Sequence, residues 1–196
     1  PLPHLRRVCF LGVEKHRGMY SVPEILSMSV MTDDAEYQAR QDSLDPWDAI
    51  NMQYTSGTTG FPKGVMLTHV GVGLNGYWIG RNQRFTDEDR VCLPVPLFHC
   101  FGCVLGVSAC VNHGACMVIL EAYNPLHVLA AVDSERCTAL YGVPTMFLAE
   151  LEHKMFKRFD VSSLRTGIMA GSVCPEPLMR RVVEDMYMKD ITICYG

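Results

Sequence analysis

The chain has 196 residues, of which 48% are hydrophobic and 19% are charged, a balance typical of a globular protein with one buried core. Its 17 basic and 21 acidic residues give a formal net charge of −4 without any basic block, which argues against nucleic acid or an anionic membrane as a partner. No apolar run reaches the roughly 20 residues that span a bilayer, and no signal peptide opens the chain, so we expect no transmembrane segment.

The nine cysteines indicate the redox state of the cellular compartment. Their number is odd, their spacing is irregular, and most lie in apolar strings such as Val91-Cys92-Leu93. Buried thiols of this kind are typical of a reducing environment, so we predict a cytoplasmic protein. The chain begins without methionine and ends in an apolar, strand-like run, which leads us to expect a fragment of a longer protein.

The first quarter of the chain predicts few regular elements. Residues 5–11 form a plausible strand that Gly12 ends, and Pro23 lies near the start of a short helix that extends to about Val30. Residues 31–47 are acidic and irregular, which predicts an exposed connection. Residues 49–54 are apolar enough to form a strand buried in a sheet.

A polar, glycine-dense loop follows at residues 54–64, YTSGTTGFPKG. Glycines let an anion approach the backbone, successive N–H groups can form a concave nest, and lysine adds a compact positive charge. We therefore predict a phosphate-binding loop rather than a plain surface turn. Its binding residues are Thr55, Ser56, Gly57, Thr58, Thr59, Gly60 and Lys63. The loop is not a Walker loop, because Lys63 follows Pro62 and precedes Gly64 instead of Ser or Thr.

Strand and helix signals alternate beyond the loop. The predicted helices cover residues 69–84, 100–111, 124–134 and 144–153, and a further helix opens at Pro175. The predicted strands cover residues 90–93, 115–120, 138–141, 165–170 and 191–195. Such alternation predicts an α/β fold, a mostly parallel sheet with flanking helices built from βαβ units. Ligands of these sheets bind outside the carboxyl ends of the strands.

Residues 54–69, YTSGTTGFPKGVMLTH, resemble the phosphate-loop signature of the adenylate-forming superfamily. That superfamily comprises acyl-coenzyme A synthetases, firefly luciferases and peptide-synthetase adenylation domains. The resemblance extends from about residue 5 to residue 196, and the segment IMAGSVCPEPLMRRV is most similar to bacterial-type fatty-acid coenzyme A ligases. It implies that residues 1–196 are part of an N-terminal ATP- and acyl-binding domain, truncated at both ends, with the C-terminal domain absent.

The resemblance also implies a reaction. A fatty acid and ATP would form acyl-AMP and pyrophosphate, and coenzyme A would then displace AMP to give the thioester. Lys63 would be the catalytic residue that, with Mg²⁺, neutralises the leaving pyrophosphate. The glutamate that binds Mg²⁺ would lie beyond Gly196, so we expect no metal site within the chain and no activity from these 196 residues alone.

Further residues receive roles from the resemblance. The segment PLFHCFG is similar to a second motif of the superfamily and implies that Phe98 and His99 line the acyl pocket, together with Val143. His99 would shape this pocket rather than transfer protons. The adenine would lie against the predicted adenine-binding residues Gly171, Ser172, Val173, Tyr195 and Gly196.

Other interpretations of the same residues stay open. His99, Cys100, Cys103, Cys110, His113 and Cys116 invite a zinc site, but no second pair matches Cys100 and Cys103, and a buried helix explains the run better. For the function, one alternative is another adenylating enzyme, of the peptide-synthetase or luciferase type. The other is a nucleotide-binding module without enzymatic activity.

Overall fold

The computed structural model describes residue 3, residues 5–55 and residues 60–195. The chain divides into two compact units, residues 1–45 and residues 46–196, and each unit is described by itself. No helix among these described residues is long and apolar enough to cross a bilayer.

The first unit contains two short strands and two helices. Strands β1 (Cys9–Phe10) and β2 (Tyr20–Ser21) pair in parallel, so the strand predicted over residues 5–11 is reduced to two residues. Helix α1 (Val22–Ser29) begins where predicted, and the Glu24 carboxylate accepts hydrogen bonds from the backbone N–H and the hydroxyl of Ser21, at 2.9 and 3.1 Å.

Helix α2 (Asp34–Asp42) corrects the prediction that residues 31–47 are irregular. The Asp33 side chain caps this helix by accepting a hydrogen bond of 2.7 Å from the Ala35 N–H. Acidic residues in the first turn and Arg40 in the last turn match the helix dipole. None of the helix residues is buried, so local capping replaces the hydrophobic periodicity that would have predicted it.

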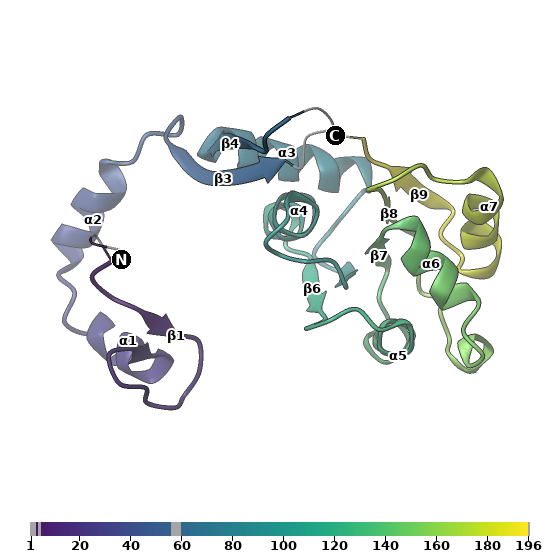
Figure 1. The fold of residues 1–196 in the computed structure, drawn as a ribbon, viewed down its shortest axis with the longest axis horizontal. Coiled ribbons are helices and arrows are strands. Elements are labelled where there is room, and N and C mark those ends of the chain that lie inside the picture. The colour runs from purple at the N-terminus through teal and green to yellow at the C-terminus, as the bar shows by residue number, and fades with distance from the viewer. Residues whose placement is uncertain (1–2, 4, 56–59, 196) are drawn as a thin grey trace. The chain divides into compact units, whose positions relative to one another are not determined.

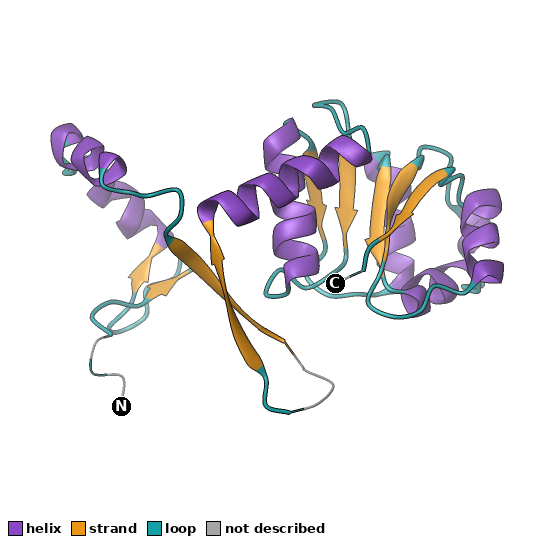
Figure 2. Ribbon diagram, turned by 90° about the horizontal axis from the view of Figure 1, so that it is seen from above, coloured by secondary structure: helices purple, strands orange, loops and turns teal. Residues whose placement is uncertain are grey.

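The second unit opens with an antiparallel hairpin of strands β3 (Ala49–Thr55) and β4 (Lys63–Thr68), which Figure 2 shows as a long two-stranded ribbon. The predicted burial of β3 is wrong, because Met52 is 53% exposed and Tyr54 is 71% exposed. Within the described part of the chain these two strands pair only with each other, and a two-stranded ribbon leaves both of its faces accessible. Strand β4 leads directly into helix α3 (His69–Asn82).

The rest of the second unit is built on a five-stranded parallel sheet, which confirms the predicted α/β fold (Figure 1). Its strands are β5 (Arg90–Leu93), β6 (Cys116–Ile119), β7 (Ala139–Gly142), β8 (Thr166–Met169) and β9 (Asp190–Ile193). Their order across the sheet is β6-β5-β7-β8-β9. The chain crosses from one strand to the next through helices, as βαβ units require.

Helices cover both faces of this sheet (Figure 2). One layer contains α3, the π-helix η1 (Phe101–Ser108) and its continuation α4 (Ala109–His113). The other layer contains α5 (Pro125–Glu135), α6 (Pro144–Leu151), the short 3₁₀ turn η2 (Phe156–Arg158) and α7 (Glu176–Asp185). Alternate residues of β5 separate the two cores, since Val91 and Leu93 face the first layer whereas Cys92 faces the second.

Glycines set the distance between α3 and the helix that follows β5. A β-carbon at Gly76 would lie 2.6 Å from the carbonyl carbon of Ser108, and one at Gly80 would lie 2.3 Å from Nδ1 of His113. The glycines of residues 69–84 therefore do not break the predicted helix. Gly76 and Gly80 instead let two helices pack closely.

An ion pair between a buried carboxylate and a partly exposed guanidinium ties the amino ends of three strands together. Asp89, which directly precedes β5, is 4% exposed and accepts two hydrogen bonds of 2.8 Å from one guanidinium nitrogen of Arg165. The Thr138 hydroxyl donates a third hydrogen bond, 2.6 Å long, to the same carboxylate. Because Thr138 precedes β7 and Arg165 precedes β8, this cluster fixes the edge of the sheet opposite to the predicted ligand site.

Candidate functional site

The carboxyl ends of the five parallel strands meet at one edge of the sheet, where the arrowheads in Figure 2 lie together. Several predicted binding segments follow directly from this edge. Phe98 and His99 lie in the connection after β5, Val143 follows β7, residues 171–173 lie just after β8, and Tyr195 follows β9. The parallel topology thus brings residues separated by almost a hundred positions to one side of the molecule.

Two of these segments are in contact. Gly171 has a left-handed conformation, with φ +87°, and a β-carbon there would lie 3.0 Å from Cγ1 of Val143. The predicted adenine segment therefore packs against a predicted acyl-pocket residue. Val173 is 87% exposed and the Tyr195 side chain is fully exposed, so both are accessible to a ligand. Gly196 lies outside the described residues.

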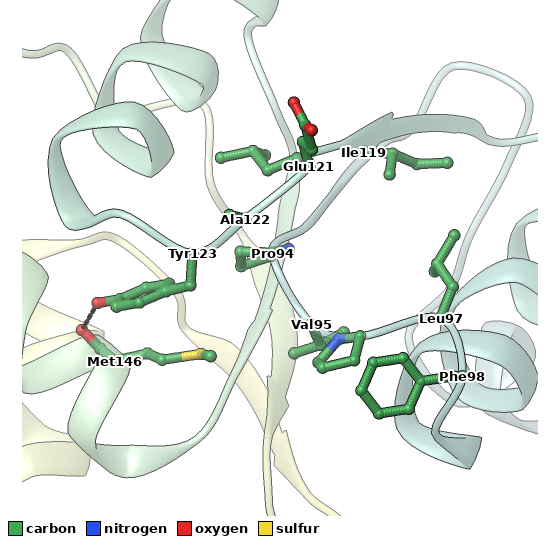
Figure 3. A pocket seen from close by; sticks show the side chains of 11 residues that line it. Pro94, Val95, Leu97, Phe98, Ile119, Glu121, Ala122, Tyr123 and Met146 are labelled. Atoms are coloured by element: carbon green, nitrogen blue, oxygen red, sulfur yellow. Dashed lines mark hydrogen bonds between the residues drawn. The ribbon is translucent and has the colours of Figure 1, made fainter. Parts of the chain in front are cut away.

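A pocket of about 430 Å³ lies at the carboxyl ends of β5 and β6 (Figure 3). Its walls are mainly apolar and include Leu97, Phe98, Ile119 and Met146. The Tyr123 hydroxyl donates a hydrogen bond of 2.9 Å to the Met146 carbonyl, which joins the connection after β6 to helix α6. Among the predicted acyl-pocket residues, Phe98 lines this pocket, whereas His99 and Val143 lie outside its walls.

Tyr123 and Met146 were missed by the sequence analysis. Neither belongs to a recognisable motif, and the only signal for Tyr123 is its position shortly after a predicted strand. Burial, together with the nearby Glu150 carboxyl, raises the pKa of Tyr123 well above its usual value. The hydroxyl therefore stays protonated at neutral pH and acts as a donor to Met146.

The predicted phosphate loop connects the two strands of the β3–β4 hairpin. Thr55 and Lys63 are direct partners across the ladder, and both are exposed. Gly60 has φ +140°, a conformation that side-chain-bearing residues rarely adopt. Ser56, Gly57, Thr58 and Thr59 lie outside the described residues. The described stem thus presents Thr55, Gly60 and Lys63 at one end of an exposed hairpin.

Metal ligands do not gather in the described part of the chain, where no group of three or more His, Cys, Asp or Glu side chains is placed to hold an ion. All nine cysteines fall within this part, and all are free thiols. The run from Cys100 to Cys110 is itself helical, and Cys110 is buried in the core.

A parallel α/β sheet with helices on both faces defines the class of domain that binds its ligands outside the carboxyl ends of the strands. Comparison with known proteins narrows this class. Residues 11–196 match the family model described as AMP-binding enzyme, and the chain belongs to that family. The recognition made from residues 54–69 is therefore confirmed.

Curated relatives of this chain include proteins described as acyl-CoA synthetases and acyl-CoA ligases. It is 53% identical over 194 residues to the putative acyl-CoA synthetase YngI of Bacillus subtilis (strain 168), covering 99% of this chain and 35% of that protein. It is also 47% identical over 197 residues to the acyl-CoA ligase SID4 of Ajellomyces capsulatus, covering 100% of this chain and 33% of the relative. The chain thus spans about a third of the length of these relatives.

Solved structures agree with the fold. The crystal structure of the anthranilate CoA ligase AuaEII in complex with anthranoyl-AMP superposes with a TM-score of 0.69 at 28% sequence identity. The superposition covers 77% of this chain and 30% of that chain. The five-stranded parallel sheet therefore belongs to the fold of adenylate-forming enzymes.

Proposed function

We propose that this chain is the ATP- and carboxylate-binding part of an acyl-CoA ligase, and that residues 1–196 form part of its N-terminal domain. The observation that carries the proposal is the segment YTSGTTGFPKG on an exposed hairpin, in a chain whose relatives are acyl-CoA ligases. The longer protein that we propose contains these residues is called the parent protein below. Its substrates are a fatty acid, ATP and coenzyme A, and it forms AMP, pyrophosphate and acyl-CoA.

The proposed first step needs no protein nucleophile. A carboxylate oxygen of the fatty acid attacks the α-phosphorus of ATP, the bond from that phosphorus to the bridging oxygen breaks, and pyrophosphate leaves. The site must orient the triphosphate and neutralise the departing charge. Lys63 and the hydroxyl and N–H donors of residues 55–60 suit this role, and Lys63 is the proposed catalytic residue.

The proposed second step forms the thioester from acyl-AMP. The thiol sulfur of coenzyme A attacks the acyl carbon of acyl-AMP, its proton is released, and AMP leaves. Mg²⁺ would add positive charge at the phosphates, as it does in other phosphoryl-transfer sites. The described residues bring no carboxylate set together for it, so we assign the metal no ligand among them.

The remaining site residues divide between the nucleotide and the acid. The exposed Tyr195 ring supplies a stacking face for adenine, and the left-handed Gly171 allows the base to approach the backbone beside Ser172 and Val173. For the acid, the apolar pocket that Phe98 lines is large enough for an alkyl chain, with Val143 and His99 next to it at the same edge. Nine free thiols support a reducing compartment, which we propose is the cytoplasm.

Carboxylate-dependent ATP–pyrophosphate exchange tests this function. The parent protein would be assayed with acids from acetate to palmitate and with aromatic acids, beside its Lys63→Ala variant. We expect exchange with one band of chain lengths and a loss of roughly 100-fold in the variant. The matched control is Lys154→Ala, which changes an exposed lysine far along the chain and should leave exchange intact.

Other outcomes distinguish the alternatives. Exchange with amino acids alone would indicate a peptide-synthetase type of enzyme, and light emission with a luciferin would indicate a luciferase-like one. ATP binding without exchange for any acid would indicate a nucleotide-binding module and contradict the proposal. The isolated 196 residues should form no acyl-CoA.

A further inference from the structure

Two cysteines with the spacing Cys-x-x-Cys lie in the first turn of the helix η1. The chain becomes helical at Cys100, and the Cys103 N–H donates a hydrogen bond of 2.9 Å to the His99 carbonyl. Residues three positions apart lie on one face of a helix, so the two thiols are neighbours. Cys100 is exposed and Cys103 is partly exposed, so a small reagent in solution can reach the pair.

A histidine nitrogen lies next to the first of these thiols. Nδ1 of His99 is 3.6 Å from the Cys100 sulfur and 3.1 Å from the Phe101 nitrogen. Because a backbone N–H always donates, Nδ1 is an acceptor, and the thiol is the donor in its contact with Cys100. A histidine that accepts the thiol proton activates a cysteine as a nucleophile. Among the described residues, no other cysteine has a histidine nitrogen within hydrogen-bond distance.

The pair is suited to redox chemistry rather than to metal binding. In the part of the chain that the structure describes, no third His, Cys, Asp or Glu side chain joins two others to hold an ion. Two thiols with this spacing can instead close a disulfide with each other. In a reducing compartment such a disulfide is transient and responds to oxidants.

We propose that Cys100 and Cys103 are a redox-sensitive dithiol, which hydrogen peroxide converts to a disulfide that reshapes the neighbouring acid pocket. The Cys100 sulfur attacks one peroxide oxygen, the O–O bond breaks, and the departing hydroxide takes the thiol proton, which leaves a sulfenic acid and water. The Cys103 sulfur then attacks the Cys100 sulfur, the S–O bond breaks, and a second water forms. The two sulfurs lose two electrons, which the peroxide oxygens gain, and a thiol reductant reverses the change.

This disulfide does not fit the helical turn without movement. The β-carbons of residues three positions apart on a helix are about 5–6 Å apart, whereas a disulfide needs about 3.5–4.5 Å, so closing the bond moves the turn by roughly 1–2 Å. Phe101 is buried and its ring stacks on the Tyr141 ring with centroids 5.7 Å apart, which holds the inner side of the turn in place. The exposed Cys100 is therefore on the side that moves.

The movement reaches the pocket through the connection that precedes the helix. Gly102 packs so closely against this connection that a β-carbon there would lie 2.4 Å from the Pro96 carbonyl oxygen. Pro96, Leu97 and Phe98 all line the pocket, and Phe98 lies two residues before Cys100 (Figure 3). A shift of the first turn therefore displaces the pocket wall. The effect on acid binding rests on the proposed function, whereas formation of the disulfide does not.

Peptide mapping of the parent protein tests the disulfide without any activity. The protein is treated with hydrogen peroxide, its free thiols are alkylated, and it is digested unreduced with chymotrypsin, which cleaves after Phe101, between the two cysteines. We expect two peptides that a bond between Cys100 and Cys103 holds together and that a thiol reductant separates. Cys116→Ser is the matched control, because Cys116 is exposed but lies outside the pair, and it should give the same linked peptides. Cys100 that is alkylated, or oxidised further, without this bond would overturn the proposal.

Carboxylate-dependent ATP–pyrophosphate exchange tests the effect on the pocket. We expect peroxide to lower exchange by roughly 10- to 100-fold, as a misplacement of about 1 Å can, and a thiol reductant to restore it. A double variant, Cys100→Ser with Cys103→Ala, should exchange at the unsubstituted rate and keep that rate in peroxide.

Two results of the exchange assay would overturn the effect on the pocket. One is an equal loss in the double variant, and the other is a disulfide that forms without changing exchange. A parent protein that shows no exchange before oxidation would contradict the proposed function, and the linked peptides would still decide whether Cys100 and Cys103 form the disulfide.

Discussion

Glu150 is a carboxyl group buried in the core between the sheet and helices α5 to α7. It is 1% exposed, and its Oε2 atom has no hydrogen-bond partner among the described residues. Burial raises the pKa of Glu150 well above its ordinary value. The sequence gives no hint of this, because Glu150 lies among the polar residues that any amphipathic helix contains.

This raised pKa predicts that stability falls as the pH rises. Above the ordinary pKa of 4.5 the unfolded chain ionises while the folded protein keeps the proton, so the free energy of unfolding decreases by roughly 1.4 kcal/mol per pH unit up to the folded pKa. Glu150→Gln removes this cost. We expect the variant to be more stable than the unsubstituted protein near pH 7 and similar near pH 4, measured by urea unfolding.

Glu152→Gln is the matched control, since Glu152 is exposed at the end of the same helix. It should show no such dependence on pH. A Glu150→Gln variant that is less stable than the unsubstituted protein at about pH 7 would mean that the carboxylate is ionised and held by a favourable partner.

Asp89 should make stability depend on pH in the opposite direction to Glu150. Burial alone would raise the pKa of Asp89, but the hydrogen bonds from Thr138 and Arg165 outweigh it and hold the pKa below its usual value of 3.8. The stability contributed by this carboxylate is therefore present above pH 3.8 and is lost as the pH falls through the folded pKa. We expect Asp89→Asn to lower the free energy of unfolding at neutral pH by roughly 2 kcal/mol, because Arg165 is partly exposed and solvent screens the pair.

The comparison variant for Asp89 is Asp87→Asn, two residues earlier and exposed. Its unfolding free energy should stay within about 0.5 kcal/mol of that of the unsubstituted protein. If Asp89→Asn also left the unfolding free energy unchanged, the cluster of Asp89, Thr138 and Arg165 would have no stabilising role.

Among the helices, the glycines of α3 predict that the same substitution lowers stability at one position and raises it at another. Gly76→Ala places a methyl group against the Ser108 backbone, and we expect a loss of roughly 1–3 kcal/mol. Gly73→Ala meets open space inside the same helix, and we expect a gain of about 0.5–1 kcal/mol. Thermal unfolding of both variants checks this, and a Gly76→Ala variant as stable as the Gly73→Ala variant would contradict close packing of α3 against η1.

Element types were predictable where the pattern was strong. The main helices and strands from residue 69 onward appear close to their expected positions, because α3, α5, α6 and α7 begin at a capping residue or proline and the strands contain short apolar runs. The short turn η2 has no such signal and was not predicted. Helix α2 was missed because it has no apolar face, and only the Asp33 cap indicates it. The burial of β3 was misjudged because an apolar strand does not reveal how many neighbours it pairs with.

At the scale of the whole molecule, the sequence predicts which segments reach the ligand edge but not which side chains meet there. Parallel topology alone places the ends of β5, β7, β8 and β9 together. The contact between Gly171 and Val143, and the pocket between the connections after β5 and β6, depend on side-chain packing between distant segments. The position of Tyr123 also depends on such packing, and no sequence motif marks it.

We propose above that the parent protein joins a carboxylate directly to the α-phosphorus of ATP. The most direct measurement uses a fatty acid labelled with oxygen-18 in its carboxyl group, together with ATP and coenzyme A. We expect AMP to gain one labelled oxygen in its phosphate, because the attacking carboxylate oxygen stays on phosphorus when the thiol takes the acyl group. AMP that gains no label while acyl-CoA accumulates would show that the carboxylate does not attack the α-phosphorus.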